Sequence, residues 1–205
     1  MSEKIKFDPF FYPNHYFYLH RWINRSILSG LMGRGLDTVS LAIRTNLPLA
    51  SINSILKGEG NPTVVDYYKI IGSAAALGIH LKMSDHLIDD MSKLRVDPES
   101  LHHQEKTRSQ NYTDINSSHQ QTNIFAFSPK CYISLHHQLN HLILKWLEER
   151  RLSEAHLALK MFLSYHSIVD ILKGEKNPSV KDYMNLLRSA GKLNVHIDIK
   201  EVLLE

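Results

Sequence analysis

Cysteine is almost absent from this chain, and its one copy, Cys131, cannot form a disulfide within the chain. A chain without disulfides is typical of a reducing compartment, so we expect a cytoplasmic protein. The sequence also lacks an uninterrupted apolar run of about 18 residues and a signal-peptide pattern. It therefore predicts neither a membrane span nor secretion.

Catalytic patterns are missing as well. There is no glycine-rich phosphate loop, and no serine, histidine and aspartate motif has a recognisable local context. The 13 histidines include one pair at helical spacing, His137 and His141, but no cysteine pair or carboxylate completes a zinc site nearby. We therefore expect no enzymatic activity, no metal and no cofactor.

The composition is that of an ordinary folded protein. The 205 residues are 43% hydrophobic and 22% charged, which allows a buried core and excludes disorder along the whole chain. At this length we expect one large domain or two small ones. The 24 basic and 21 acidic residues give a net charge of only +3, so a polyanionic partner would depend on the placement of cations rather than on their excess.

The chain repeats itself at an offset of 116 residues. The segment ILKGEGNP, which begins at Ile55, aligns with ILKGEKNP from Ile171. Without a gap the alignment covers residues 16–83 over residues 132–199, with about 28 identities in about 68 positions. The identical pairs include Leu19/Leu135, His20/His136, Asn24/Asn140, Leu41/Leu157, Asp66/Asp182 and Tyr67/Tyr183. This duplication favours two small units.

A stretch of different character separates the two units. It is rich in Gln, Asn, Ser, Thr and His and shows little apolar periodicity. We therefore divide the chain into a first unit (1–93), a polar linker (94–129) and a second unit (130–205). The first unit has 10 basic and 8 acidic residues, the linker 3 and 4, and the second unit 11 and 9. Neither unit is a basic tail.

Helices dominate the expected local structure. Apolar residues at three- and four-residue spacing from Leu135 to Leu147 predict a helix that ends near Arg150. Ser153 and Ser164 are expected to cap two short helices, the second of which stops at Gly174. A capping-box pattern from Pro178 predicts a fourth helix, and the first unit repeats this pattern.

Each unit ends in an alternating pattern that predicts a strand with one buried face. The two segments are residues 78–83 and 194–199. Because a lone strand cannot satisfy its backbone hydrogen bonds, we predict that these two segments pair. The pairing would make a pseudo-dimer within one chain or a homodimer of two chains. The expected fold is mainly α, with two helical units that each end in a short strand.

The run from Leu152 to Ser179, with its two short helices, tight turn and KGEKNP loop, resembles the phage-repressor (Cro/CI, or XRE) helix-turn-helix family. The terminal strands are similar to those of HipB-type antitoxins. The resemblance covers most of both repeats and implies a DNA-binding transcriptional regulator, most simply a repressor. The second short helix of each unit would enter the major groove of double-stranded DNA, and the elements around it would contact phosphates. Two recognition helices on one face would lie about 34 Å apart.

The resemblance also implies DNA-binding residues in both units. In the second unit the groove-facing residues would be Tyr165, His166, Ser167 and Asp170, supported by Ser153, Ser164, Lys160, Lys173, Lys176 and Asn177. In the first unit they would be Leu49, Ala50, Ser51, Ser54 and neighbouring Asn53, supported by Arg44, Asn46, Lys57 and Asn61. Because Leu49 and Ala50 offer thymine methyl contacts but no hydrogen-bond donor, the second unit would read sequence, and the first would read shape or backbone. Alternatively, the first unit serves only dimerisation.

The chain departs from the family pattern in three places. A glutamine common at the start of the first short helix is replaced by Thr38 and Glu154, and a carboxylate there would repel phosphate. The turn position that is often glycine is Asn46 in one unit and Phe162 in the other. An arginine–glutamate pair common in the family is replaced by leucine in both units, as Leu31 with Leu56 and Leu147 with Leu172, which exchanges a salt bridge for apolar packing.

Two alternatives from other functional classes stay open. An antitoxin would bind a toxin partner and its own promoter, whereas a protein-interaction scaffold would keep the fold without DNA binding. An aromatic segment at residues 7–18 is expected to pack as an arm on the first unit, or to form a patch for a protein partner.

Overall fold

The computed structural model describes residues 11–84 and 124–195. Within these residues the chain is mainly helical, with eight helices and one small antiparallel sheet. The first repeat contains α1 (Phe11–Gly33), α2 (Thr38–Thr45), α3 (Leu49–Lys57), α4 (Val64–Ala76) and strand β1 (Leu81–Ser84). Strand β2 (Ile124–Phe127) comes before α7 (Pro129–Glu149), α8 (Glu154–Met161), α9 (Tyr165–Lys173) and α10 (Val180–Lys192).

Local sequence signals account for the helix ends. The Ser164 hydroxyl accepts a hydrogen bond from the Ser167 N–H at the start of α9. Thr63 and Asp66 form a reciprocal capping box at the start of α4. Gly174 ends α9 with a φ of 76°, a left-handed conformation that glycine adopts without a steric penalty. These sequence-based predictions are therefore confirmed.

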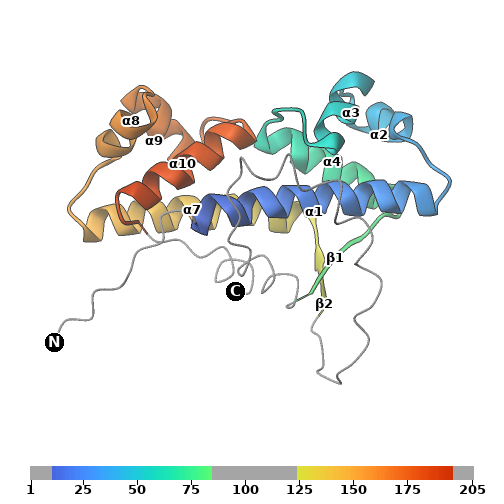
Figure 1. Ribbon diagram of the computed structural model, residues 1–205, viewed down its shortest axis with the longest axis horizontal. Helices are drawn as coiled ribbons and strands as arrows, with labels where there is room; N and C mark the ends of the chain where they lie inside the picture. Colours follow the sequence, from blue (N-terminus) through green and yellow to red (C-terminus); the bar gives the residue numbers. More distant parts are fainter. Residues whose placement is uncertain (1–10, 85–123, 196–205) are drawn as a thin grey trace, which may run out of the picture.

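The two repeats pack across one another. Helix α1 packs mainly against α10, and the equivalent helix of the second repeat, α7, packs mainly against α4. In Figure 1, α1 and α7 extend along the long axis of the molecule, and the α2–α3 and α8–α9 pairs lie at its opposite ends on the same side. Buried apolar residues of both repeats belong to one hydrophobic cluster. The repeats thus share a core and do not meet only through a linker.

The structure describes a strand pairing that the sequence did not predict, and the predicted pairing of residues 78–83 with 194–199 lies mainly outside the described residues. Strand β1 pairs with β2, Leu81 lying opposite Phe127 in the register, and β2 falls in the stretch predicted to be linker. Of the predicted partner, residues 194–199, only the first two are described, and Asn194 sits in a turn with a φ of 60°. The alternation of apolar and polar residues over 78–83 correctly predicted a strand, and β1 overlaps this segment. Such a pattern carries no information about which strand is the partner.

The aromatic segment of residues 7–18 is described from Phe11 onward, where it forms the first turns of α1. Tyr16 is fully buried, and its hydroxyl lies 2.7 Å from Nε2 of His136 in the second repeat. This part of the segment therefore packs across the junction between the repeats. Residues 7–10 and the predicted unit boundary at residue 93 lie outside the described residues.

Candidate nucleic-acid interface

In the first repeat, α2 and α3 are joined by a tight turn. Asp37 accepts a hydrogen bond from the Ser40 N–H and so begins α2. The helix ends at Asn46, whose φ is 57°, a left-handed conformation that asparagine tolerates. Pro48 then precedes α3. Its first residue, Leu49, is exposed, so the first turn of α3 is accessible from solvent.

The second repeat builds the same turn from different residues. Ser153 forms a capping box with His156 at the start of α8. The left-handed position is taken by Phe162, with a φ of 55°, which is an unusual place for a bulky side chain. Tyr165 and His166 then open α9, and both are exposed. The two turns therefore have the same geometry and different surface chemistry.

The sequence-predicted DNA-binding residues fall into two groups by exposure. Exposed are Arg44, Asn46, Leu49, Ala50, Ser51, Lys57 and Asn61 in the first repeat, and Ser153, Lys160, Ser164, Tyr165, His166, Lys173, Lys176 and Asn177 in the second. Half-buried are Asn53, Ser54, Ser167 and Asp170. Asn61 and Asn177 lie at the junction of the two repeats. The structure brings most of the other second-repeat residues together around α9 and most of the other first-repeat residues around α3, and the α2–α3 and α8–α9 pairs lie at opposite ends of the molecule (Figure 1).

Several of these residues have partners within the protein. The Lys176 ammonium donates to the Ser167 hydroxyl at 3.0 Å, which holds one predicted phosphate contact against a predicted groove residue. The Thr38 hydroxyl donates to Asn53 Oδ1 at 2.7 Å, so this amide oxygen ties the start of α2 to α3. Asn53 is therefore committed in part to the internal packing of its repeat.

The Asn-Pro sequence of each repeat joins the two repeats. Asn177 Oδ1 accepts from the Val65 N–H at 3.1 Å, and Asn61 Oδ1 accepts from the Lys181 N–H at 3.2 Å. The Val64 N–H donates to the Pro178 carbonyl at 3.0 Å, and the reciprocal bond at Pro62 is 2.8 Å long. Each repeat thus caps the first turn of the other repeat's last long helix. The predicted phosphate role of these asparagines competes with this structural one.

A symmetric hydrogen-bond network lies buried between α1 and α7. Tyr16 bonds to His136, and Tyr132 lies 2.7 Å from Nε2 of His20. Nδ1 of each histidine lies 2.7 Å from a backbone carbonyl of its own helix, at Tyr16 for His20 and at Tyr132 for His136. Since a carbonyl only accepts, Nδ1 carries the proton, and Nε2 of a neutral ring accepts from the tyrosine hydroxyl.

Burial controls the ionisation of this network. Removal from water lowers the pKa of His20 to about 3 and that of His136 to about 4, although the backbone carbonyl bonds act in the opposite direction. Burial also raises the pKa of Tyr16 and Tyr132 well above the usual value. Both histidines are therefore neutral at physiological pH, and the network is structural.

Sequence reasoning did not assign these buried tyrosines. Tyr67 donates to Asn24 Oδ1 at 3.0 Å, and its counterpart Tyr183 donates to Asn140 Oδ1 at 2.7 Å. The sequence did contain a signal for these tyrosines, because they form two identical pairs at the 116-residue offset, Tyr16 with Tyr132 and Tyr67 with Tyr183. Leu31 and Leu56 of the first repeat are buried, as are Leu147 and Leu172 of the second, and they contribute apolar packing at these positions.

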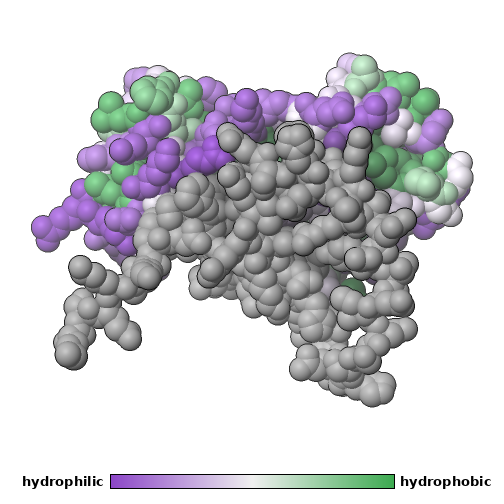
Figure 2. Space-filling view, viewed as in Figure 1, coloured by the Kyte–Doolittle hydropathy of each residue, from purple (hydrophilic) through white to green (hydrophobic). Residues whose placement is uncertain are grey.

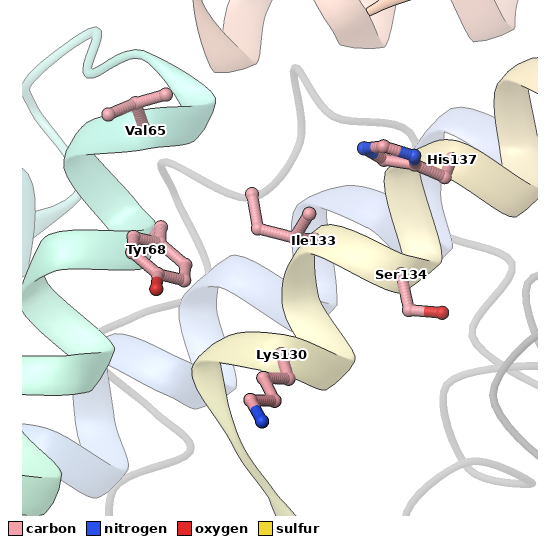
Figure 3. A pocket seen from close by; sticks show the side chains of 6 residues that line it. All are labelled: Val65, Tyr68, Lys130, Ile133, Ser134 and His137. Carbon is pink, nitrogen blue, oxygen red and sulfur yellow. The ribbon is translucent and has the colours of Figure 1, made fainter.

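An open groove of about 560 Å³ lies between α4 and α7. Figure 3 shows Tyr68 and His137 projecting from the two helices toward this groove, with Ile133 between them and Lys130 extending away. These polar groups do not converge on one point, so the groove has no arrangement typical of a small-molecule site. His137 and His141 are exposed, and no cluster of metal-ligating side chains occurs within residues 11–84 and 124–195.

Comparisons of the chain with protein-family models, curated proteins and solved structures found no significant match. Among the helices that the structure describes, none combines the length and the apolar character needed to cross a bilayer.

Proposed function

We propose that the protein is a sequence-specific DNA-binding regulator of transcription, most simply a repressor, in which α2–α3 and α8–α9 are two helix-turn-helix units. The observation that carries the proposal is the placement of two exposed helix starts, at Leu49 and Tyr165, at opposite ends of one side of the molecule (Figure 1). One chain would then span two half-sites without a second subunit. The proposal includes a cytoplasmic location and assigns no reaction to the chain.

Each unit has exposed cations beside its proposed recognition helix. Lys57 and Lys173 stand at equivalent positions in the last turns of α3 and α9, and Arg44 and Lys160 at equivalent positions of α2 and α8. All four are exposed, so they can reach phosphates on either side of a groove. Because these cations are repeated beside both proposed recognition helices, the chain can contact phosphates although its net charge is only +3.

The surfaces of the two proposed recognition helices differ. Helix α9 presents Tyr165 and His166, which offer hydrogen-bonding groups to base edges. Helix α3 presents Leu49 and Ala50, which offer only apolar contact. We therefore assign sequence discrimination to the second unit and a shape or backbone role to the first, and we expect an asymmetric operator.

The test is anisotropy titration of labelled 24-bp duplexes of random sequence across a salt series, followed by selection and sequencing of bound genomic fragments. Binding should weaken steeply as salt rises, and Lys173→Ala should reduce the salt slope by about one unit on every sequence. Lys192→Ala, at the exposed end of α10, is the control and should leave the slope unchanged. Absence of binding to any duplex at low salt would refute the proposal.

A second candidate is a protein-interaction scaffold. The apolar start of α3 and the carboxylate of Glu154, beside the position where a helix would meet phosphate, favour it. The two candidates separate in the same titration, since a scaffold would bind no duplex and would respond to none of the lysine variants.

A further inference from the structure

Helices α2 and α8 carry exposed apolar side chains that the core does not use. Ile43 is 76% exposed, and Leu159, its counterpart in the second repeat, is 75% exposed. Val39 lies one turn before Ile43 and is also exposed, while Phe162, three residues after Leu159, is 95% exposed. We call Val39 with Ile43 the first end patch, and Leu159 with Phe162 the second end patch.

These patches are not a by-product of folding. Each helix contributes to the core through a different residue, Leu41 in α2 and Leu157 in α8, and both are completely buried. A single exposed apolar side chain is common on protein surfaces. Here Ile43 and Leu159 recur at equivalent positions of the two repeats, and each has a second exposed apolar residue within four positions of it in the sequence. These second residues are not equivalent, because Val39 aligns with Ala155 and Phe162 aligns with Asn46. The recurrence of the Ile43/Leu159 pair points to a partner for both patches.

The location of the patches limits what can cover them. Figure 1 places α2 and α8 at the two ends of the long axis, and Figure 2 shows apolar surface at both ends, separated by hydrophilic surface. Val39, Ile43 and Leu159 belong to α2 and α8, and Phe162 directly follows α8 in the turn before α9, whereas the proposed groove residues belong to α3 and α9. A partner at the ends therefore leaves the starts of the recognition helices accessible.

We infer that the first end patch of one copy packs against the second end patch of a neighbouring copy when both are bound to DNA. This inference rests on the proposed DNA-binding function. Two patches of the same chemistry at opposite ends of one chain allow a head-to-tail contact, and such a contact repeats along a line. A duplex holds successive copies along that line.

The size of the patches also favours a contact assisted by DNA. A stable complex buries about 800 Å² on each partner, whereas each end patch consists of two side chains. Such a contact is too small to hold two copies together in dilute solution. Binding to one duplex raises the effective concentration of the neighbours, which makes a weak contact sufficient. The expected result is cooperative binding by a chain that is monomeric without DNA.

The experiment compares two random-sequence duplexes at low salt, one of 20 bp that holds a single copy and one of 120 bp that holds several. The chain should bind the long duplex cooperatively, with an affinity per site about tenfold higher than on the short one. The double variant Ile43→Gln/Leu159→Gln should lose this cooperativity and keep the affinity for the short duplex. Ile124→Gln, which changes an exposed apolar residue of β2, is the matched control and should behave as the unmodified chain.

The alternative results are distinguishable. Binding to the short duplex with no cooperativity on the long one would overturn this inference and leave the DNA-binding proposal intact. Weaker binding of the double variant to the short duplex would mean that the patches face DNA, which also overturns it. No binding to either duplex would overturn both proposals. Circular dichroism of each variant should match that of the unmodified chain, since all three positions are exposed.

Discussion

The Tyr16 hydroxyl lies 2.7 Å from Nε2 of His136, across the junction between the two repeats. The equivalent residues Tyr132 and His20 make the same contact at the same distance, so the junction has a twofold pattern within one chain. Every polar atom of these two bonds is removed from water, and the bonds are satisfied only when the repeats are in register. The network therefore selects one relative placement of the two units.

We expect Tyr16→Phe to lower the free energy of unfolding by about 1–3 kcal/mol, because it leaves the buried Nε2 of His136 without its donor. Tyr132→Phe should have a similar effect, since it removes the equivalent bond. Tyr68→Phe is the control, because Tyr68 is 42% exposed, and it should change stability little. Urea unfolding measures all three, and equal stability of Tyr16→Phe and the control would contradict the assignment.

Stability should fall as the pH drops from 7 to 5. In the unfolded chain each histidine takes up a proton near pH 6.5, whereas in the folded chain His20 and His136 do so only at about pH 3 and 4. The unfolded state therefore binds more protons throughout this window, and the contribution of the neutral rings, present above pH 6.5, is lost on acidification. At pH 5 the loss is about 2 kcal/mol for each ring.

Thermal unfolding at pH 7, 6 and 5 tests this expectation. His137→Gln, which removes an exposed histidine of α7, should retain the pH dependence. A melting temperature that stays constant between pH 7 and 5 would show that the two buried rings titrate normally.

The two roles considered for Asn177 predict different effects of alanine on stability and of aspartate on DNA binding. If Asn177 acts as a cap on α4, Asn177→Ala should lower the free energy of unfolding by about 0.5–2 kcal/mol. Asn177→Asp keeps an acceptor oxygen for the Val65 N–H and should change the free energy of unfolding little. If Asn177 instead contacts phosphate, Asn177→Asp should fold normally and bind duplex DNA more weakly. Urea unfolding and duplex titration of the same two variants distinguish these outcomes.

Phe162→Gly should stabilise the protein by up to about 1 kcal/mol. Phe162 has a positive φ and its ring is almost completely exposed, so glycine removes backbone strain without removing core packing. Asn46→Gly, at the equivalent position, should raise the free energy of unfolding by less, because asparagine tolerates this conformation. A destabilised Phe162→Gly variant would mean that the ring contributes contacts to the fold.

His166→Ala should change which sequences are bound more than how tightly DNA is bound overall. An exposed imidazole at the start of α9 can contact base edges, whereas the lysines around it contact phosphates on any sequence. Selection of bound fragments with the variant and the unmodified chain measures this difference. Identical selected motifs would remove His166 from the proposed set of base contacts.

Much of the local structure was determined by the sequence itself. The repeat at an offset of 116 residues is visible by aligning the chain with itself. The caps at Ser164 and Thr63 and the stop at Gly174 depend on residues within about a turn of one another, and such contacts can be predicted from spacing. The identical Tyr, His and Asn pairs also indicated that both repeats use these residues in the same way. The sequence did not indicate which atoms these tyrosine, histidine and asparagine side chains contact.

Tertiary structure decided which elements meet. The pairing of β1 with β2, the packing of α1 on α10 and of α4 on α7, and the bonds of Asn61 and Asn177 to the opposite repeat all join residues far apart in the chain. An amphipathic face or a strand pattern requires a partner but does not specify one. The choice came from shape and from buried hydrogen bonds that only one arrangement of the two repeats can satisfy.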